Sequence, residues 1–136
     1  MKKKFIQIVV VIMLVFIGSS CKKYASGPPV FPTGDRKIRF ELYTDQDFSG
    51  NASVINFSIF IRTQNQTLLD SALASMEIKD IPDAAHKLVI EKTVTGYINA
   101  DLAAGFNYEI QNVGFSWYTD TSKAGTVLKV IDYNFH

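Results

Sequence analysis

Catalysis at neutral pH usually needs a side chain that takes up and releases a proton, and the chain has only two histidines, His86 and His136. Asp80, Asp83 or Asp101 could orient His86. His136 is the last residue given, where we expect fraying. No Gly-x-Ser-x-Gly stretch presents a nucleophilic serine. We therefore expect no catalytic residues and a protein that is not an enzyme; a small hydrolase with an unrecognised site is an alternative.

A second chemical possibility is calcium binding between residues 45 and 56. Asp45, Asp47 and Ser49 place oxygens at alternate positions before Gly50, as in the first half of a calcium loop. The position at which an EF-hand has a bidentate glutamate is Asn56, and strands are expected on both sides. We interpret the segment as a polar hairpin turn. Asp45, Asp47 and Ser49 are kept as calcium candidates, and no cofactor and no other metal site are expected.

Exposed aromatic side chains could stack against sugar rings, which suggests a glycan-binding alternative. Strand alternation restricts which of them share a surface. We expect Phe115 and Trp117 to point into the core with Val113, because large aromatic side chains are highly buried on average. Tyr43 and Tyr118 then remain as the surface candidates for ligand binding.

The tripeptide Asp70-Ser71-Ala72 resembles the acceptor sequence for O-glycosylation in some envelope proteins of the Bacteroidetes group. The resemblance implies that Ser71 is the candidate glycosylation site.

The only cysteine, Cys21, follows a segment with the order of a signal peptide. Lys2–Lys4 form a basic start, Phe5–Ile17 an apolar run, and Gly18–Ser20 a small-residue end. At ~1.5 Å per residue the apolar run reaches only about 20 Å of a ~30 Å hydrocarbon core, so it is short for a membrane span. Residues 17–21 resemble the lipobox of bacterial lipoprotein precursors, with Gly18 where leucine is usual.

That resemblance implies lipidation of Cys21, palmitate among the acyl chains, and cleavage just before it. We expect three parts: a signal peptide at residues 1–20, a lipidated cysteine with a Pro/Gly-rich tether at residues 21–35, and a domain at residues 36–136. The start of the mature chain also resembles uncharacterised lipoproteins of the Bacteroidetes group. Lys22 stands where an aspartate would resemble an inner-membrane retention signal, so we expect anchoring to the outer membrane.

Charge argues against nucleic acid as a partner. Lys2–Lys4 are the only charged residues before Cys21, so removal of residues 1–20 leaves 11 basic and 13 acidic side chains, a net charge of −2. A weakly acidic domain without basic clusters lacks the electrostatic footprint for phosphate backbones.

The domain itself is dominated by a period of two, which is typical of half-buried strands. In residues 37–43, Ile38, Phe40 and Leu42 share one face, and alternate residues of 54–63 are likewise apolar. Residues 68–79 match either a strand ending before Pro82 or a helix, and we favour the strand. Further strands are expected at residues 87–95, at 105–110 continuing through 113–119, and at 126–135.

The stretch from Leu102 to Ile110 resembles the Leu-x-x-Gly-x-x-Tyr-x-Val pattern of fibronectin type III domains, with Gly105 and Tyr108 at the matching positions. In that family the tyrosine hydroxyl bonds to upstream backbone and forms a corner. The early core tryptophan of the family is missing. We expect an all-β fold, an antiparallel immunoglobulin-like (fibronectin type III-like) β-sandwich of about seven strands.

Together these features predict a membrane-anchored cell-envelope lipoprotein that acts as a non-catalytic binding or structural module. Its partner, a protein or a glycan of the envelope, is not identified by the sequence.

Overall fold

The computed structural model describes residues 34–136, so the predicted signal peptide, Cys21 and nearly all of the tether lie outside the described residues. The first strand begins at Asp35, one residue before the predicted domain. The described strands are β1 (Asp35–Tyr43), β2 (Val54–Arg62), β3 (Thr67–Ala72), β4 (Met76–Glu77), β5 (Leu88–Thr95), β6 (Leu102–Ile110), β7 (Gly114–Ser122) and β8 (Leu128–Asn134). A short 3₁₀ helix, η1 (Ile78–Asp80), follows β4.

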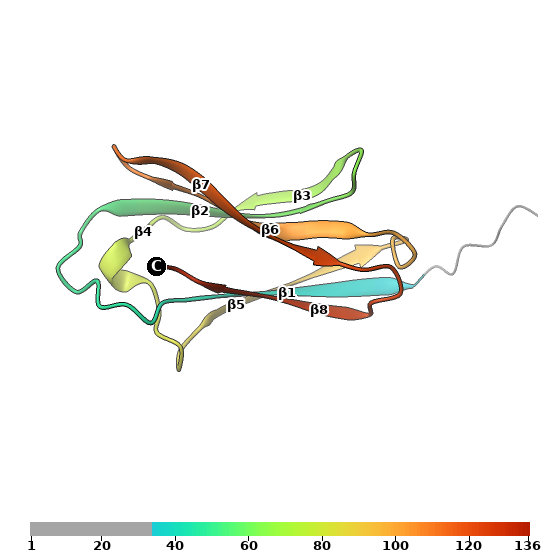
Figure 1. The fold of residues 1–136 in the computed structure, drawn as a ribbon, viewed down its shortest axis with the longest axis horizontal. Coiled ribbons are helices and arrows are strands. Elements are labelled where there is room, and N and C mark those ends of the chain that lie inside the picture. The colour runs from blue at the N-terminus through green and yellow to red at the C-terminus, as the bar shows by residue number, and fades with distance from the viewer. Residues whose placement is uncertain (1–33) are drawn as a thin grey trace, which may run out of the picture. The chain divides into compact units, whose positions relative to one another are not determined.

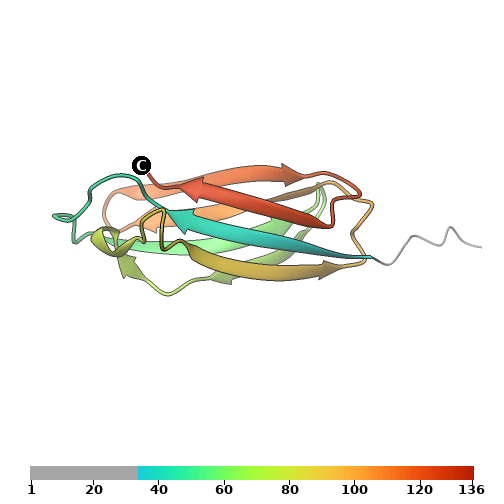
Figure 2. The same ribbon diagram turned by 90° about the horizontal axis from the view of Figure 1, so that it is seen from below.

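The strands form two sheets that face each other, as Figures 1 and 2 show from two directions. One sheet has three strands in the order β5-β1-β8. The other has the order β3-β2-β6-β7, with β4 also paired to β2. The described domain is therefore an all-β, sandwich-like fold, as the sequence predicts.

One strand pair departs from the expected antiparallel arrangement. The first and last strands, β1 and β8, run parallel, with Phe40 opposite Ile131. The expectation of a wholly antiparallel sandwich is therefore wrong, and the three-stranded sheet is mixed. A parallel pair needs a crossover connection between its strands. Here that connection contains all the strands of the other sheet, which lie between β1 and β8 in the sequence.

The core lies between the sheets, and in β1 and β2 it consists of the faces that the alternation predicts. Every member of the two apolar series in β1 and β2 is buried: Ile38, Phe40, Leu42, Ile55, Phe57, Ile59 and Ile61. An edge-to-face contact between Phe40 of β1 and Phe106 of β6, at 5.6 Å between ring centroids, joins the sheets at the centre.

The ambiguous segment at residues 68–79 is extended at its start but is not one strand. β3 ends at Ala72, β4 pairs separately with β2, and η1 buries Ile78. The favoured single strand is wrong because residues 73–75 interrupt it, and of the alternative, a helix, this segment has only the start of the short η1. The strand predicted at residues 105–110 does not continue through 113–119: β6 and β7 are two antiparallel strands joined by a tight turn, with Asn112 at φ 62°.

Residues 45–51 connect the two sheets, because β1 and β2 belong to different sheets. The interpretation of this segment as a hairpin turn is therefore wrong: it is a crossover loop. Phe48 in the loop packs on Phe135 at 5.5 Å between ring centroids and closes this end of the core.

The motif that resembles fibronectin type III domains falls on β6. Among the side-chain hydrogen bonds described for residues 34–136, none joins the Tyr108 hydroxyl to upstream backbone; the ring packs among Phe57, Tyr133 and Phe135. The glycine of the motif, Gly105, is required by the spacing of the two strands. A Cβ there would lie 1.8 Å from the Tyr118 carbonyl oxygen, so β6 and β7 approach too closely for any side chain.

A buried arginine holds the other end of the sandwich. Arg36 in β1 donates to the Ile98 carbonyl oxygen at 2.7 Å and to the Ser122 carbonyl oxygen at 3.2 Å, and its residue is fully buried. Desolvation lowers the pKa of Arg36, while Asp101 acts in the opposite direction. The guanidinium links β1 to the end of β7 and to the loop before β6.

Candidate functional site

The most exposed aromatic side chains of the described domain lie on β7. Phe115 is 62% and Trp117 65% exposed, and their ring centroids are 6.2 Å apart. The expectation that Phe115, Trp117 and Val113 point into the core is therefore wrong. Two large aromatic rings held side by side in solvent are unusual for a surface that contacts nothing.

Strand register explains the reversed face. Tyr118 pairs with Phe106, which is fully buried, so Tyr118 shares the inward face. Trp117 pairs with Asn107, whose side chain belongs to the outward face. Since both faces of β7 carry aromatic side chains, hydrophobicity alone did not decide between them.

Polar side chains continue this outer surface across β6 and β2. Trp117 lies opposite Asn107, which lies opposite Ser58. Two residues further along each strand, at the next outward-facing positions, Phe115 lies opposite Glu109, which lies opposite Asn56. We call the surface formed by these residues the aromatic face: Asn56, Ser58, Asn107, Glu109, Phe115 and Trp117.

The aromatic face is hollowed beside Phe115. The hollow has a volume of about 190 Å³, and its lining includes Asn56, Ser58, Asn107 and Glu109. The hydroxyl of Ser75 donates to Asn56 Oδ1, which orients that amide. The lining of the hollow therefore combines amide, hydroxyl and carboxylate side chains with the aromatic ring of Phe115.

Further along the same outer surface, the aromatic ring of Phe60 is covered. Phe60 lies opposite Gly105 and is only 5% exposed. The Arg62 guanidinium lies 4.9 Å from the centre of the Phe60 ring and covers it. The exposed aromatic surface is thus confined to the end of the sheet near the β6–β7 turn.

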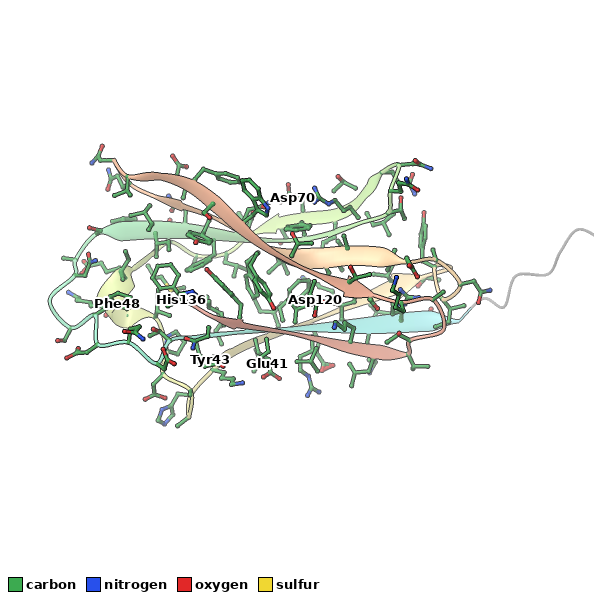
Figure 3. The ribbon with its side chains drawn as sticks, viewed as in Figure 1. Glu41, Tyr43, Phe48, Asp70, Asp120 and His136 are labelled. Atoms are coloured by element: carbon green, nitrogen blue, oxygen red, sulfur yellow. The ribbon has the colours of Figure 1, made fainter. Side chains whose placement is uncertain are left out.

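Tyr43, a predicted ligand-binding residue, lies on the outer side of the other sheet together with Glu41 (Figure 3). Lys87 Nζ is 4.3 Å from the Tyr43 ring centre and binds Asp132 at 2.7 Å and Glu41 at 3.1 Å. These hydrogen bonds raise the pKa of Lys87. The Lys87 ammonium therefore already covers one face of the Tyr43 ring.

Tyr118, the other predicted ligand-binding residue, is half-buried. Its ring stacks on Tyr133 at 4.8 Å with an interplanar angle of 19°. Tyr43 and Tyr118 belong to different sheets, so they do not form a common surface. The exposed aromatic rings expected at Tyr43 and Tyr118 are found instead at Phe115 and Trp117.

The calcium candidates lie in the exposed crossover loop. Asp47 accepts a hydrogen bond from the Ser49 backbone nitrogen at 3.0 Å, which lowers the pKa of Asp47. Hydrogen bonds with Asn134 and Gln46 lower the pKa of Asp45. Within residues 34–136, no cluster of three or more His, Cys, Asp or Glu side chains is placed to hold a metal ion. Calcium binding here stays a prediction.

His86 pairs with Asp83, one of the three predicted partners. Its Nδ1 lies 2.8 Å from Asp83 Oδ1, and hydrogen bonding with His86 lowers the pKa of Asp83. The pair forms an exposed turn, with the His86 side chain 80% exposed. His136 Nδ1 contacts the Asn134 carbonyl oxygen at 2.9 Å. Neither histidine lines the hollow of the aromatic face.

Ser71, the predicted glycosylation site, is partly buried on β3, a strand at the edge of its sheet. Its glycosylation stays a prediction, and Cys21 lies outside the described residues. Within residues 34–136, no helix has the length and apolar character to cross a bilayer.

The comparisons with known proteins give no match: no family model, no curated protein and no solved structure is similar to this chain.

Proposed function

We propose that this chain is an exported lipoprotein, anchored through lipid on Cys21, whose sandwich binds its partner non-catalytically through the aromatic face. The exposed pair of Phe115 and Trp117 carries this proposal. Burying two such rings would release ordered water and stabilise a complex by a few kcal/mol. The exposed turn that holds His86 and Asp83 lacks the enclosed surroundings in which catalytic bases are tuned, which supports a binding role over hydrolysis.

We also propose that the sandwich is a variant of the immunoglobulin-like type. The position of β6 between β2 and β7 supports this, because in that type strand F, which carries the corner tyrosine, lies between strands C and G. The parallel pairing of β8 with β1 is the departure from it.

Anchoring is tested by the intact mass of the protein extracted from membranes. We expect a product that begins at Cys21 and carries acyl chains, and a Cys21→Ser variant that is not acylated and is lost from the membrane fraction. An exported product with an unmodified Cys21 would contradict the anchor and leave the binding proposal to its own test.

The binding face is tested by placing a photoreactive phenylalanine analogue at position 117 or, as the control, at position 128. Leu128 is 47% exposed on the outer face of the other sheet. After irradiation of whole cells, we expect a discrete adduct from position 117 and none from position 128. Equal labelling at both positions, or none at either, would remove the aromatic face as the binding surface.

A further inference from the structure

We infer that the ligand of the aromatic face is a neutral glycan chain, one sugar of which sits in the hollow beside Phe115 while a neighbouring sugar stacks on Trp117. This inference rests on the proposed function, because it names the ligand class of the same surface.

The first step is the combination of groups. A sugar presents C–H bonds on its ring faces and hydroxyl groups around its rim, so it is matched by an aromatic face beside hydrogen-bonding side chains. Trp117 lies opposite Asn107, and Phe115 lies opposite Glu109, in consecutive outward-facing pairs of β6 and β7. Each ring therefore has an amide or a carboxylate beside it.

The second step is size. A hollow of about 190 Å³ is smaller than the pockets of ~300–1,000 Å³ that enclose drug-sized ligands. Trp117 lies outside this lining, with its ring centroid 6.2 Å from that of Phe115. This shape suits a ligand made of repeated small units, of which one enters the hollow and the next remains on the surface.

The third step is charge. The lining of the hollow contains Glu109 and no lysine, arginine or histidine. An acidic polysaccharide would place its carboxylates or sulfates near Glu109 without a compensating cation, which is unfavourable. The chemistry therefore favours an uncharged glycan.

A peptide and a second copy of this chain are the competing occupants. Peptides that bind sheets pair with an edge strand and fill apolar pockets with alternate side chains. The hollow instead lies over β2 and β6, inside the sheet, and its lining includes the side chains of Asn56, Ser58 and Asn107. The centre of a self-associating surface would be expected to lack charged side chains, whereas Glu109 lines this hollow.

The test is native gel electrophoresis of the full exported protein, in detergent, through gels that contain dextran, mannan, xylan, alginate or polygalacturonate. We expect retardation by at least one of the three neutral polymers and by neither acidic one. Trp117→Ala should weaken that binding about tenfold or more, as should Phe115→Ala, because each removes a stacking ring. Asn107→Ala should weaken it severalfold.

Leu128→Ala is the matched control, an exposed apolar side chain on the other sheet, and should leave retardation unchanged. Far-UV circular dichroism should show that Trp117→Ala stays folded, since the ring is 65% exposed. Trp117 is the only tryptophan, so saturable quenching of intrinsic fluorescence by the bound polymer should report this surface alone.

Absence of retardation by all three neutral polymers, or equal retardation of the wild type and Trp117→Ala, would overturn the inference. Concentration-dependent dimerisation abolished by Trp117→Ala would assign the face to a second copy and also overturn it. A protein adduct at position 117 in cells, without glycan binding, would reject the glycan while the proposed binding face stands. Failure of both experiments would reject both.

Discussion

At Gly105 the backbones of β6 and β7 approach so closely that a single methyl group has no room. The position matches the glycine of the fibronectin type III pattern, and the contact gives a physical reason for a glycine there that the pattern alone does not supply. Any side chain at this position would displace the backbone carbonyl of Tyr118.

We expect Gly105→Ala to lower the free energy of unfolding by about 3 kcal/mol, because a Cβ would meet backbone that moves only with its strand. Gly50→Ala is the control, since a Cβ there has no atom within 4 Å. Urea unfolding of both variants measures the difference. Equal stability of the two variants would contradict the close approach.

Tyr133 is the residue whose protonation should couple to folding. Burial and, to a smaller degree, contact with Tyr108 raise the pKa of Tyr133 above its usual range. Above about pH 10 an unfolded chain loses this proton while the folded protein keeps it. Tyr133 therefore lowers stability progressively as the pH rises above 10.

We expect the free energy of unfolding of the wild type to fall more steeply between pH 9 and pH 11 than that of Tyr133→Phe, which cannot ionise at this position. The comparison removes the contributions of the other tyrosines and the lysines, which both proteins share. Parallel pH profiles from urea titrations would show that the Tyr133 hydroxyl is not held in its neutral form by folding.

At the scale of the elements, two contacts hold the end of β7 to the three-stranded sheet. Arg36 of β1 binds the carbonyl of Ser122, and Lys129 of β8 forms an ion pair with Asp120 at 2.5 Å. Asp120 lies between the two sheets (Figure 3). These contacts hold the even-numbered side chains of β7, from Ser116 to Ser122, on the inward face of the strand. Because side chains alternate, Trp117 then points outward.

Arg36→Met should cost about 2–4 kcal/mol of stability, because it keeps the volume of the stem but leaves the Ser122 and Ile98 carbonyl groups without their donor. Arg39→Met removes the exposed ion pair with Glu91 and should cost less than about 1 kcal/mol. Thermal unfolding of the two variants checks the ranking, and a costlier loss at Arg39 would contradict it.

At the scale of the whole molecule, the two sheets share one core, so we expect them to unfold together. Contacts of Phe106 with Phe40 and with Tyr133 tie β6 to both β1 and β8. In urea, the far-UV signal of the strands and the near-UV signal of the tyrosine cluster should change at the same midpoint. Trp117 fluorescence should change little, since the ring is already exposed. Separate midpoints would mean that the sheets are independent units.

Local sequence determined much of this domain. Alternation along β1 and β2 identified both strands and their buried faces, because one face of each is continuously apolar and the other is mostly polar. Residues 68–79 were ambiguous, since Ala72 and Met76 fit both a helical stripe and one face of a strand. The strand predicted at residues 105–110 is confirmed as part of β6, with Gly105 at a position that only a glycine can occupy.

The tertiary structure decided what alternation cannot. Period two assigns side chains to two faces but does not say which face is inside, and on β7 both faces carry aromatic rings. Pairing of Tyr118 with Phe106 settled that question and created the candidate site. The parallel pairing of β1 with β8 could not be predicted either, because it joins strands from opposite ends of the domain sequence and uses the edge of β1 that β5 does not occupy.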